Sequence, residues 1–136
     1  MEDAIARYRL ASQDNDIETL MAQLADDVEL VSPLSSHAVF RGRADARLLL
    51  SAVYGSLRDF VWDEEVGDAT VRVVVGHGHV GPFALSDAMV LDLGDDGRIR
   101  RIRPHLRPWL GLTWFALAVA AKLVRHPGVL VRALRG

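Results

Sequence analysis

Asp87 is the residue whose type and position most directly suggest chemistry. It lies in the segment PFALSDAMVLDLG, where strand alternation puts it on one face with four apolar side chains, Phe83, Leu85, Met89 and Leu91. A carboxylate on an apolar face is costly unless it is paired or protonated, and burial raises its pKa. A neutral Asp87 could donate a hydrogen bond to a carbonyl or enolate oxygen. The alternative is a buried structural aspartate that bonds to a backbone amide or an arginine.

Tyr8 and the histidines are the other side chains suited to proton chemistry. Tyr8 falls on the apolar stripe of a predicted first helix. Its hydroxyl either donates to the same carbonyl or enolate oxygen as Asp87 or sits at the rim of the core. Histidine titrates near neutrality, so His37 and His105 are candidate acid/base groups. His77 and His79 alternate with glycine on a strand, but no third ligand has suitable spacing, and no metal site is expected.

The elements that must position these residues follow an α-then-β order. Apolar spacing at i, i+3, i+4 and i+7 predicts helices over residues 2–13, 14–27 and 43–57. The second of these would bury Ile17, Leu20, Met21 and Leu24. Strands are predicted over 28–32, 38–42, 59–68, 69–80, 82–94 and 98–106, because these segments are rich in β-branched and aromatic residues. The order predicts an α+β fold with helices covering one face of a curved sheet.

Charge divides the chain into two unequal parts. The first 97 residues carry 18 acidic and seven basic side chains, whereas the last 39 carry nine basic and no acidic ones. A basic tail of this kind either docks on the acidic body or meets an anionic partner or membrane surface, and we favour the first interpretation. The arginines of RIRRIRPHLR alternate toward solvent without an aromatic platform, so nucleic acid is not an expected partner.

Two further compositional features bear on the protein's environment. The chain has no cysteine, which excludes disulfides and thiolate metal sites. The start, MEDAIARYRL, lacks a basic region followed by an apolar one, so a cytoplasmic location is expected.

The C-terminal segment WLGLTWFALAVAAKLV has no charge from Trp109 to Ala121. It is shorter than the roughly 20 apolar residues of a membrane span and apolar on every side, so it needs cover. Three uses compete: a lid over a pocket, a dimer contact, or a helix on a membrane surface. The last would be helped by the basic residues Lys122, Arg125, Arg132 and Arg135. We favour the lid or the dimer contact.

The order of elements, led by RYRLASQDNDIETLMAQLADDVELVSP, resembles the nuclear transport factor 2-like superfamily over about residues 3–106. This group includes SnoaL-like polyketide cyclases, ketosteroid isomerases and limonene-epoxide-hydrolase-like proteins. The resemblance implies a cone, in which a curved mixed sheet wraps N-terminal helices and leaves an apolar pocket. It divides the chain into a domain over 1–108 and a C-terminal helical extension of the same domain over 109–136.

Three positions can be carried over from the resemblance to ketosteroid isomerases. Tyr8, in Arg7-Tyr8, and Asp87, in Ser86-Asp87, match the oxyanion-stabilising pair. Ser32, in Ser32-Pro33, stands where those enzymes hold a carboxylate base. A serine hydroxyl is a poor base without a neighbouring one, and serine before proline is also a good strand stop. His105 or His37 would then have to move the proton.

The expected function is that of a small-molecule pocket protein of isomerase or cyclase type. It would act on an apolar carbonyl compound, such as a polyketide, steroid or terpenoid, through enolate stabilisation by Asp87 and Tyr8. One alternative is a non-catalytic ligand-binding or dimerisation module, which Ser32 favours. A weaker one is a limonene-type epoxide hydrolase, with Arg101 or Arg103 beside Asp87 but no convincing second carboxylate.

We expect a homodimer and no cofactor. The residues expected to line the pocket are Ser32, Phe40, Tyr54, Phe60, Trp62, Phe83, Leu85 and Met89.

Overall fold

The structure is a computed structural model that describes residues 3–32 and 37–135. Pro33, the second residue of the predicted Ser-Pro strand stop, lies outside the described residues. The elements in chain order are α1 Ala4–Gln13, α2 Ile17–Ala22, β1 Leu24–Val31, β2 Val39–Arg41, α3 Arg43–Ser56, β3 Arg58–Gly67, β4 Val71–Val80, β5 Phe83–Leu93, β6 Ile99–Arg107, α4 Trp109–Leu123 and α5 Pro127–Leu134.

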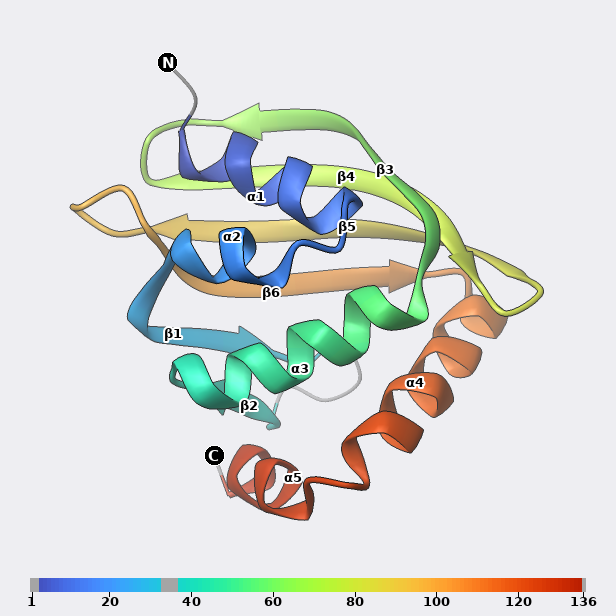
Figure 1. The fold of residues 1–136 in the computed structure, drawn as a ribbon. Helices are drawn as coiled ribbons and strands as arrows, with labels where there is room; N and C mark the ends of the chain where they lie inside the picture. The colour runs from blue at the N-terminus through green and yellow to red at the C-terminus, as the bar shows by residue number, and fades with distance from the viewer. Residues whose placement is uncertain (1–2, 33–36, 136) are drawn as a thin grey trace.

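The strands form one mixed sheet in the order β2-β1-β6-β5-β4-β3. Neighbouring strands are antiparallel except β1 and β6, which are parallel. Helices α1, α2 and α3 lie over one face of this curved sheet (Figure 1). The buried side chains of β5 alternate toward the helices and include Leu85, Asp87, Met89 and Leu91. The predicted α+β class and the shared face of Asp87 are both confirmed.

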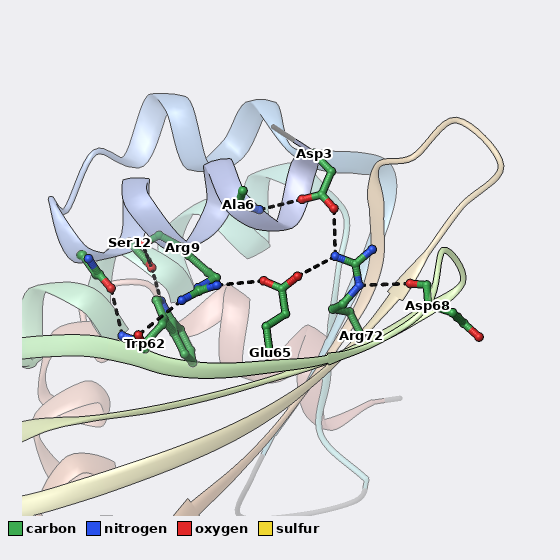
Figure 2. Close-up of polar contacts among 9 residues, drawn as sticks. Asp3, Ala6, Arg9, Ser12, Trp62, Glu65, Asp68 and Arg72 are labelled. Atoms are coloured by element: carbon green, nitrogen blue, oxygen red, sulfur yellow. Dashed lines mark hydrogen bonds and ion pairs between the residues drawn. The ribbon is translucent and has the colours of Figure 1, made fainter. Parts of the chain in front are cut away.

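Helix α1 carries Tyr8, and ion pairs hold its position on the sheet. Glu65 of β3 accepts from Arg9 of α1 at 3.0 Å and from Arg72 of β4 at 2.7 Å. Arg72 also donates to Asp3 at 2.9 Å, and Asp3 caps the helix by accepting from the backbone N–H of Ala6. Figure 2 shows this chain of alternating charges running from the start of α1 onto the β3–β4 hairpin.

A second set of bonds fastens the other end of α1. The indole N–H of Trp62 in β3 donates to the Ser12 hydroxyl at 2.8 Å (Figure 2). Arg9 donates to the carbonyl of Trp62 at 3.3 Å. The predicted apolar stripe of this helix, on which Tyr8 falls, is confirmed, because Ala4, Ile5 and Tyr8 are all buried.

The alternation of glycine and histidine in β4 has a packing cause. A side chain at Gly76 would come within 2.8 Å of both Phe60 and Trp62, and one at Gly78 within 2.8 Å of Phe60. The two glycines therefore leave room for the aromatic side chains of β3 on the helix-covered face. His77, between them, points to the other face of the sheet and is exposed.

The second helix is shorter than predicted. It ends at Ala22, and Leu24 is already the first residue of β1, where it lies opposite Ile99 of β6. The Ile99 amide donates to the Gln23 carbonyl at 2.9 Å. Strand pairing therefore begins at residues whose apolar spacing in the sequence still fits a helix. The prediction that Leu24 belongs to the helix stripe, and that the strand starts at 28, was wrong for this reason.

The C-terminal segment forms two helices that pack against the body of the domain. Helix α4 lies beside α3, and α5 lies near β2 (Figure 1). Arg132 of α5 makes two hydrogen bonds to the carboxylate of Asp45 in α3, at 2.8 and 2.7 Å. One basic residue of the tail thus docks on the acidic body. No helix within residues 3–32 and 37–135 is long and apolar enough to cross a membrane.

Candidate functional site

An apolar cavity of about 260 Å³ lies between the sheet and the C-terminal helices. Its walls come from β1, β2, α3, β3, β5 and β6 of the body and from α4 and α5. Six of the residues expected to line a pocket do so here: Ser32, Phe40, Tyr54, Phe60, Leu85 and Met89.

Two expected lining residues lie elsewhere. Trp62 turns toward α1, where Ser12 accepts its indole N–H, and its ring packs edge-on against Phe60 at 4.7 Å between centroids. Phe83 lies at the start of β5 and packs against Trp114 of α4, with centroids 5.5 Å apart. Neither side chain is among the residues that line this cavity.

Asp87 provides the only carboxyl group among the described residues that line the cavity. Its side chain is buried, and its Oδ1 atom has no hydrogen-bond partner within the described part of the chain. Burial raises the pKa of Asp87 to about 7, against the weaker opposing effect of a hydrogen bond from the His105 backbone. Near neutral pH this group exists both as an acid that can donate and as a carboxylate that can accept.

Tyr54 places a second polar group at the cavity, and Tyr8 stands behind it. The two hydroxyls hydrogen-bond to each other at 2.7 Å, and the rings meet edge to face at 6.2 Å between centroids. Burial raises the pKa of both phenols, so both stay protonated at neutral pH. Tyr8 is fully buried and is not a lining residue, so any effect it has on a ligand passes through Tyr54.

His105 lies on the wrong face of the sheet to move a proton in this cavity. In β6 it is opposite Ala88, whereas Asp87 is opposite Leu106. Leu106 lines the cavity, and strand alternation turns the exposed His105 to the outer face, where its Nδ1 lies 3.2 Å from the Ala88 carbonyl. His105 is therefore not among the residues that line this cavity.

His37 and Ser32 lie close together at the end of β1. The Ser32 amide donates to the Ala38 carbonyl at 3.0 Å. Ser32 and Ala38 both line the cavity. His37 precedes Ala38, is exposed, and is not a lining residue. The structure thus places Ser32, at the expected base position, in the wall, and His37 lies next to that wall in the chain.

The outer face of the sheet holds the remaining polar candidates. Arg103 and Asp92 pair there at 3.3 Å, and His77 lies 2.7 Å from Asp63. Arg101, close to Glu29 at 3.8 Å, is also away from the cavity. An arginine between two carboxylates, as an epoxide hydrolase of the limonene type would need, is therefore not assembled among the described lining residues.

Sequence reasoning missed two parts of this site. The Tyr8–Tyr54 hydrogen bond joins helices far apart in the chain, although each tyrosine falls on an apolar stripe that faces the core. The cavity wall formed by Phe115, Val119 and Leu123 of α4 was also missed in detail. The spacing i, i+4, i+8 of these three residues was the available signal for a buried face.

Known structures share the fold of this chain over most of its length. A bacterial protein with a cystatin-like fold from Silicibacter pomeroyi, described as uncharacterized, superposes with a TM-score of 0.89 at 20% identity, covering 98% of this chain and 95% of that one. A steroid delta-isomerase from Pseudomonas aeruginosa superposes with a TM-score of 0.83 at 22% identity, covering 92% of each chain. An NTF-2 like protein of unknown function from Burkholderia xenovorans gives 0.68 at 16% identity, covering 82% and 89%.

The chain has the nuclear transport factor 2-like fold. The fold resemblance inferred from the sequence is thereby confirmed. No family model matches the sequence, and no curated protein matches it. Because the nuclear transport factor 2-like fold carries both enzymes and binding proteins, the chemistry of this chain has to be argued from its own cavity.

Proposed function

We propose that this chain binds an apolar carbonyl compound in the cavity and promotes its isomerisation or cyclisation through an enolate. The observation that carries the proposal is the Oδ1 atom of Asp87, which has no partner among the described residues and lies in a mostly apolar wall. A buried polar atom without a partner is costly, and a ligand oxygen would relieve that cost. The steroid delta-isomerase that shares the fold supports the reaction class.

The protonated carboxyl of Asp87 would donate to the carbonyl oxygen as negative charge develops there. Such a donor in a water-poor site stabilises the enolate more than the ketone, and so lowers the barrier. In an isomerisation, a proton leaves the carbon next to the carbonyl and a proton returns to another carbon of the conjugated system, so the atoms balance without a co-reactant. Tyr54, held by Tyr8, supplies a second polar contact at the same wall.

The cavity wall contains no strong base that could accept the proton from the ligand, among the described residues other than Asp87. Ser32 occupies the position expected for a base, and its hydroxyl does not ionise near neutral pH unassisted. His37 lies next to this wall in the chain and is our candidate for the acceptor. A ligand that carries its own basic group could accept the proton itself, and then neither Ser32 nor His37 would be needed as a base.

Ser32 favours a second candidate function, a binding protein without turnover. In that case Asp87 and Tyr54 fix the orientation of the ligand and no proton moves. The cavity is slightly smaller than the roughly 300–1,000 Å³ typical of drug-sized ligand sites, so both functions call for a compact ligand.

A pair of ligands that differ only in the carbonyl tests the proposal. Equilibrium dialysis would compare a cyclic ketone with the hydrocarbon of the same ring skeleton, for skeletons of one to three rings. We expect the ketone to bind about tenfold more tightly, and Asp87→Ala to remove that difference, because one charge-assisted or acid hydrogen bond is lost. Equal affinity of the wild-type protein for both members of every pair would overturn the proposal.

A further inference from the structure

Helix α4 presents apolar side chains on the side away from the cavity as well as toward it. Leu110, Trp114, Leu117 and Val124 follow one another at helical spacing, and they are exposed by 51%, 43%, 65% and 62%. Trp109, at the start of the helix, is 74% exposed. We call these five residues the α4 stripe. It extends over about 20 Å at 1.5 Å per residue, which is unusual for a surface that meets only water.

The charged residues at the two ends of the α4 stripe are basic. Arg107 precedes the helix and Arg125 follows it, and both are exposed. No acidic residue occurs after Asp96, so nothing within this segment neutralises them. An apolar stripe with tryptophans, flanked by cations, fits the boundary between the headgroups and acyl chains of an anionic bilayer.

A second copy of the chain fits the α4 stripe less well. Two stripes packed against each other, in either direction, would bring arginine ends against arginine ends. Each contact would then place like charges together, with no acid of the C-terminal segment to offset them. An anionic lipid surface instead complements both the apolar residues and the cations.

We propose that the α4 stripe is a docking surface for anionic lipid bilayers. The helix lies on the bilayer surface and does not cross it. Its opposite side, with Phe115 and Val119, forms part of the cavity wall, so docking places the cavity one helix away from the lipid. This inference goes beyond the proposed function and does not depend on it, because it uses neither Asp87 nor any reaction.

Intrinsic fluorescence gives a direct readout of docking. The chain has three tryptophans, of which Trp62 is buried while Trp109 and Trp114 are exposed on the stripe. We expect a blue shift of the emission, and co-sedimentation, with vesicles of 70% phosphatidylcholine and 30% phosphatidylglycerol. Pure phosphatidylcholine vesicles should bind at least about fivefold more weakly, and 0.5 M NaCl should remove most of that difference.

Matched variants distinguish binding through the α4 stripe from non-specific hydrophobic adsorption and from the effect of net charge. Leu117→Asp should lower the partition coefficient by at least about tenfold, whereas Leu10→Asp, at a similarly exposed leucine of α1, should not. Arg125→Glu should weaken binding by at least about fivefold. Arg100→Glu changes an arginine near the start of β6, beside Gly94 and outside the C-terminal helices, and should have a clearly smaller effect.

Two results would overturn the proposal. One is equal binding of anionic and neutral vesicles, or none to either, by the full-length wild-type protein. The other is a dimer in sedimentation velocity at micromolar concentration that Leu117→Asp dissociates, since a second copy would then cover the stripe. Circular dichroism of each variant checks that its fold is intact.

Discussion

The hydroxyl oxygens of Tyr8 and Tyr54 lie 2.7 Å apart, joining α1 to α3 beneath the cavity. Of the two, only Tyr54 lines the cavity. The hydrogen bond from Tyr8 therefore ties the cavity wall to helix α1. Helix α1 is itself held by the ion pairs of Arg9 and Arg72 with Glu65. The polar groups around Asp87 are therefore fixed before any ligand arrives, which is the condition for stabilising a developing charge.

Phenylalanine substitutions test the coupling of the two tyrosines. Tyr8→Phe and Tyr54→Phe should each lower the free energy of unfolding by about 1–2 kcal/mol, because each leaves the other buried hydroxyl without this partner. The double variant should lose less than the sum of the two. Urea denaturation of all four proteins measures the coupling, and additive losses would show that the hydrogen bond contributes nothing.

Asp87 should make the stability of the protein fall as the pH rises. Its pKa is about 7 in the folded chain and near 3.8 in the unfolded chain, so the folded state holds the extra proton between these values. Stability contributed by the neutral form is complete below about pH 4 and is lost as the pH rises through about 7. From pH 5 to pH 8 the expected loss is about 2–3 kcal/mol.

Asp87→Asn should remove this dependence and make the variant more stable than the wild type at pH 8. The measurement is the free energy of unfolding in urea at pH 5 and pH 8 for both proteins. Asp63→Asn, on the exposed outer face beside His77, is the control for other effects of losing a carboxylate. Parallel pH profiles for wild type and Asp87→Asn would contradict the burial of Asp87 in an apolar wall.

The two candidate histidines should behave differently. His105→Ala should leave turnover within about twofold of wild type, because the side chain is on the sheet face away from the cavity. His37→Gln should lower kcat by about 10²-fold if it accepts the proton, with little change in KM. The initial rates of both variants decide this, and a large loss in His105→Ala alone would mean that the assigned strand register misplaces the site.

The contact between Arg132 and Asp45 should stabilise the docking of α5. The Arg132 guanidinium, through its hydrogen bonds, holds the pKa of the Asp45 carboxyl below its usual value. This contribution is present above about pH 4 and is lost as the pH falls through the lowered pKa. Arg132→Gln should lower the midpoint of thermal unfolding modestly at pH 7, since the guanidinium is largely exposed, and by less at pH 3.

The control for that substitution is Arg135→Gln, which changes an exposed arginine of the same helix end. Thermal unfolding at the two pH values compares the pair. Equal effects of both substitutions at pH 7 would show that charge in the tail, and not the Asp45 contact, determines the result.

The features that depend on the periodicity of apolar residues could be predicted from the sequence. The α+β class, the buried stripe of α1 and the face shared by Asp87 with Leu85 and Met89 all depend on repeats of 3.6 or 2 residues, which the fold preserves. The resemblance to the nuclear transport factor 2-like superfamily added the expectation of a cone.

What could not be predicted depends on contacts between distant segments. Leu24 was assigned to a helix because its pairing with Ile99 of β6 is invisible in local pattern. The face of His105 depends on strand register, in which one residue reverses the direction of the side chain. Trp62 turned away from the cavity because Ser12 of α1 accepts its indole N–H, a partner 50 residues away.

The conversion of β,γ-unsaturated cyclic ketones to their conjugated isomers tests the central claim most directly. The initial rate would be followed by ultraviolet absorbance for the wild type, Asp87→Ala and Asp63→Asn between pH 5 and pH 9. The account predicts that kcat/KM falls by at least about 10²-fold in Asp87→Ala and is unchanged in Asp63→Asn. It also predicts that wild-type activity declines as the pH rises through about 7, because Asp87 then loses the proton it donates.

A folded Asp87→Ala protein with wild-type turnover would contradict the account. If the wild type binds the ketones more tightly than the matching hydrocarbons but converts none of them, the enzymatic proposal fails and the binding function remains.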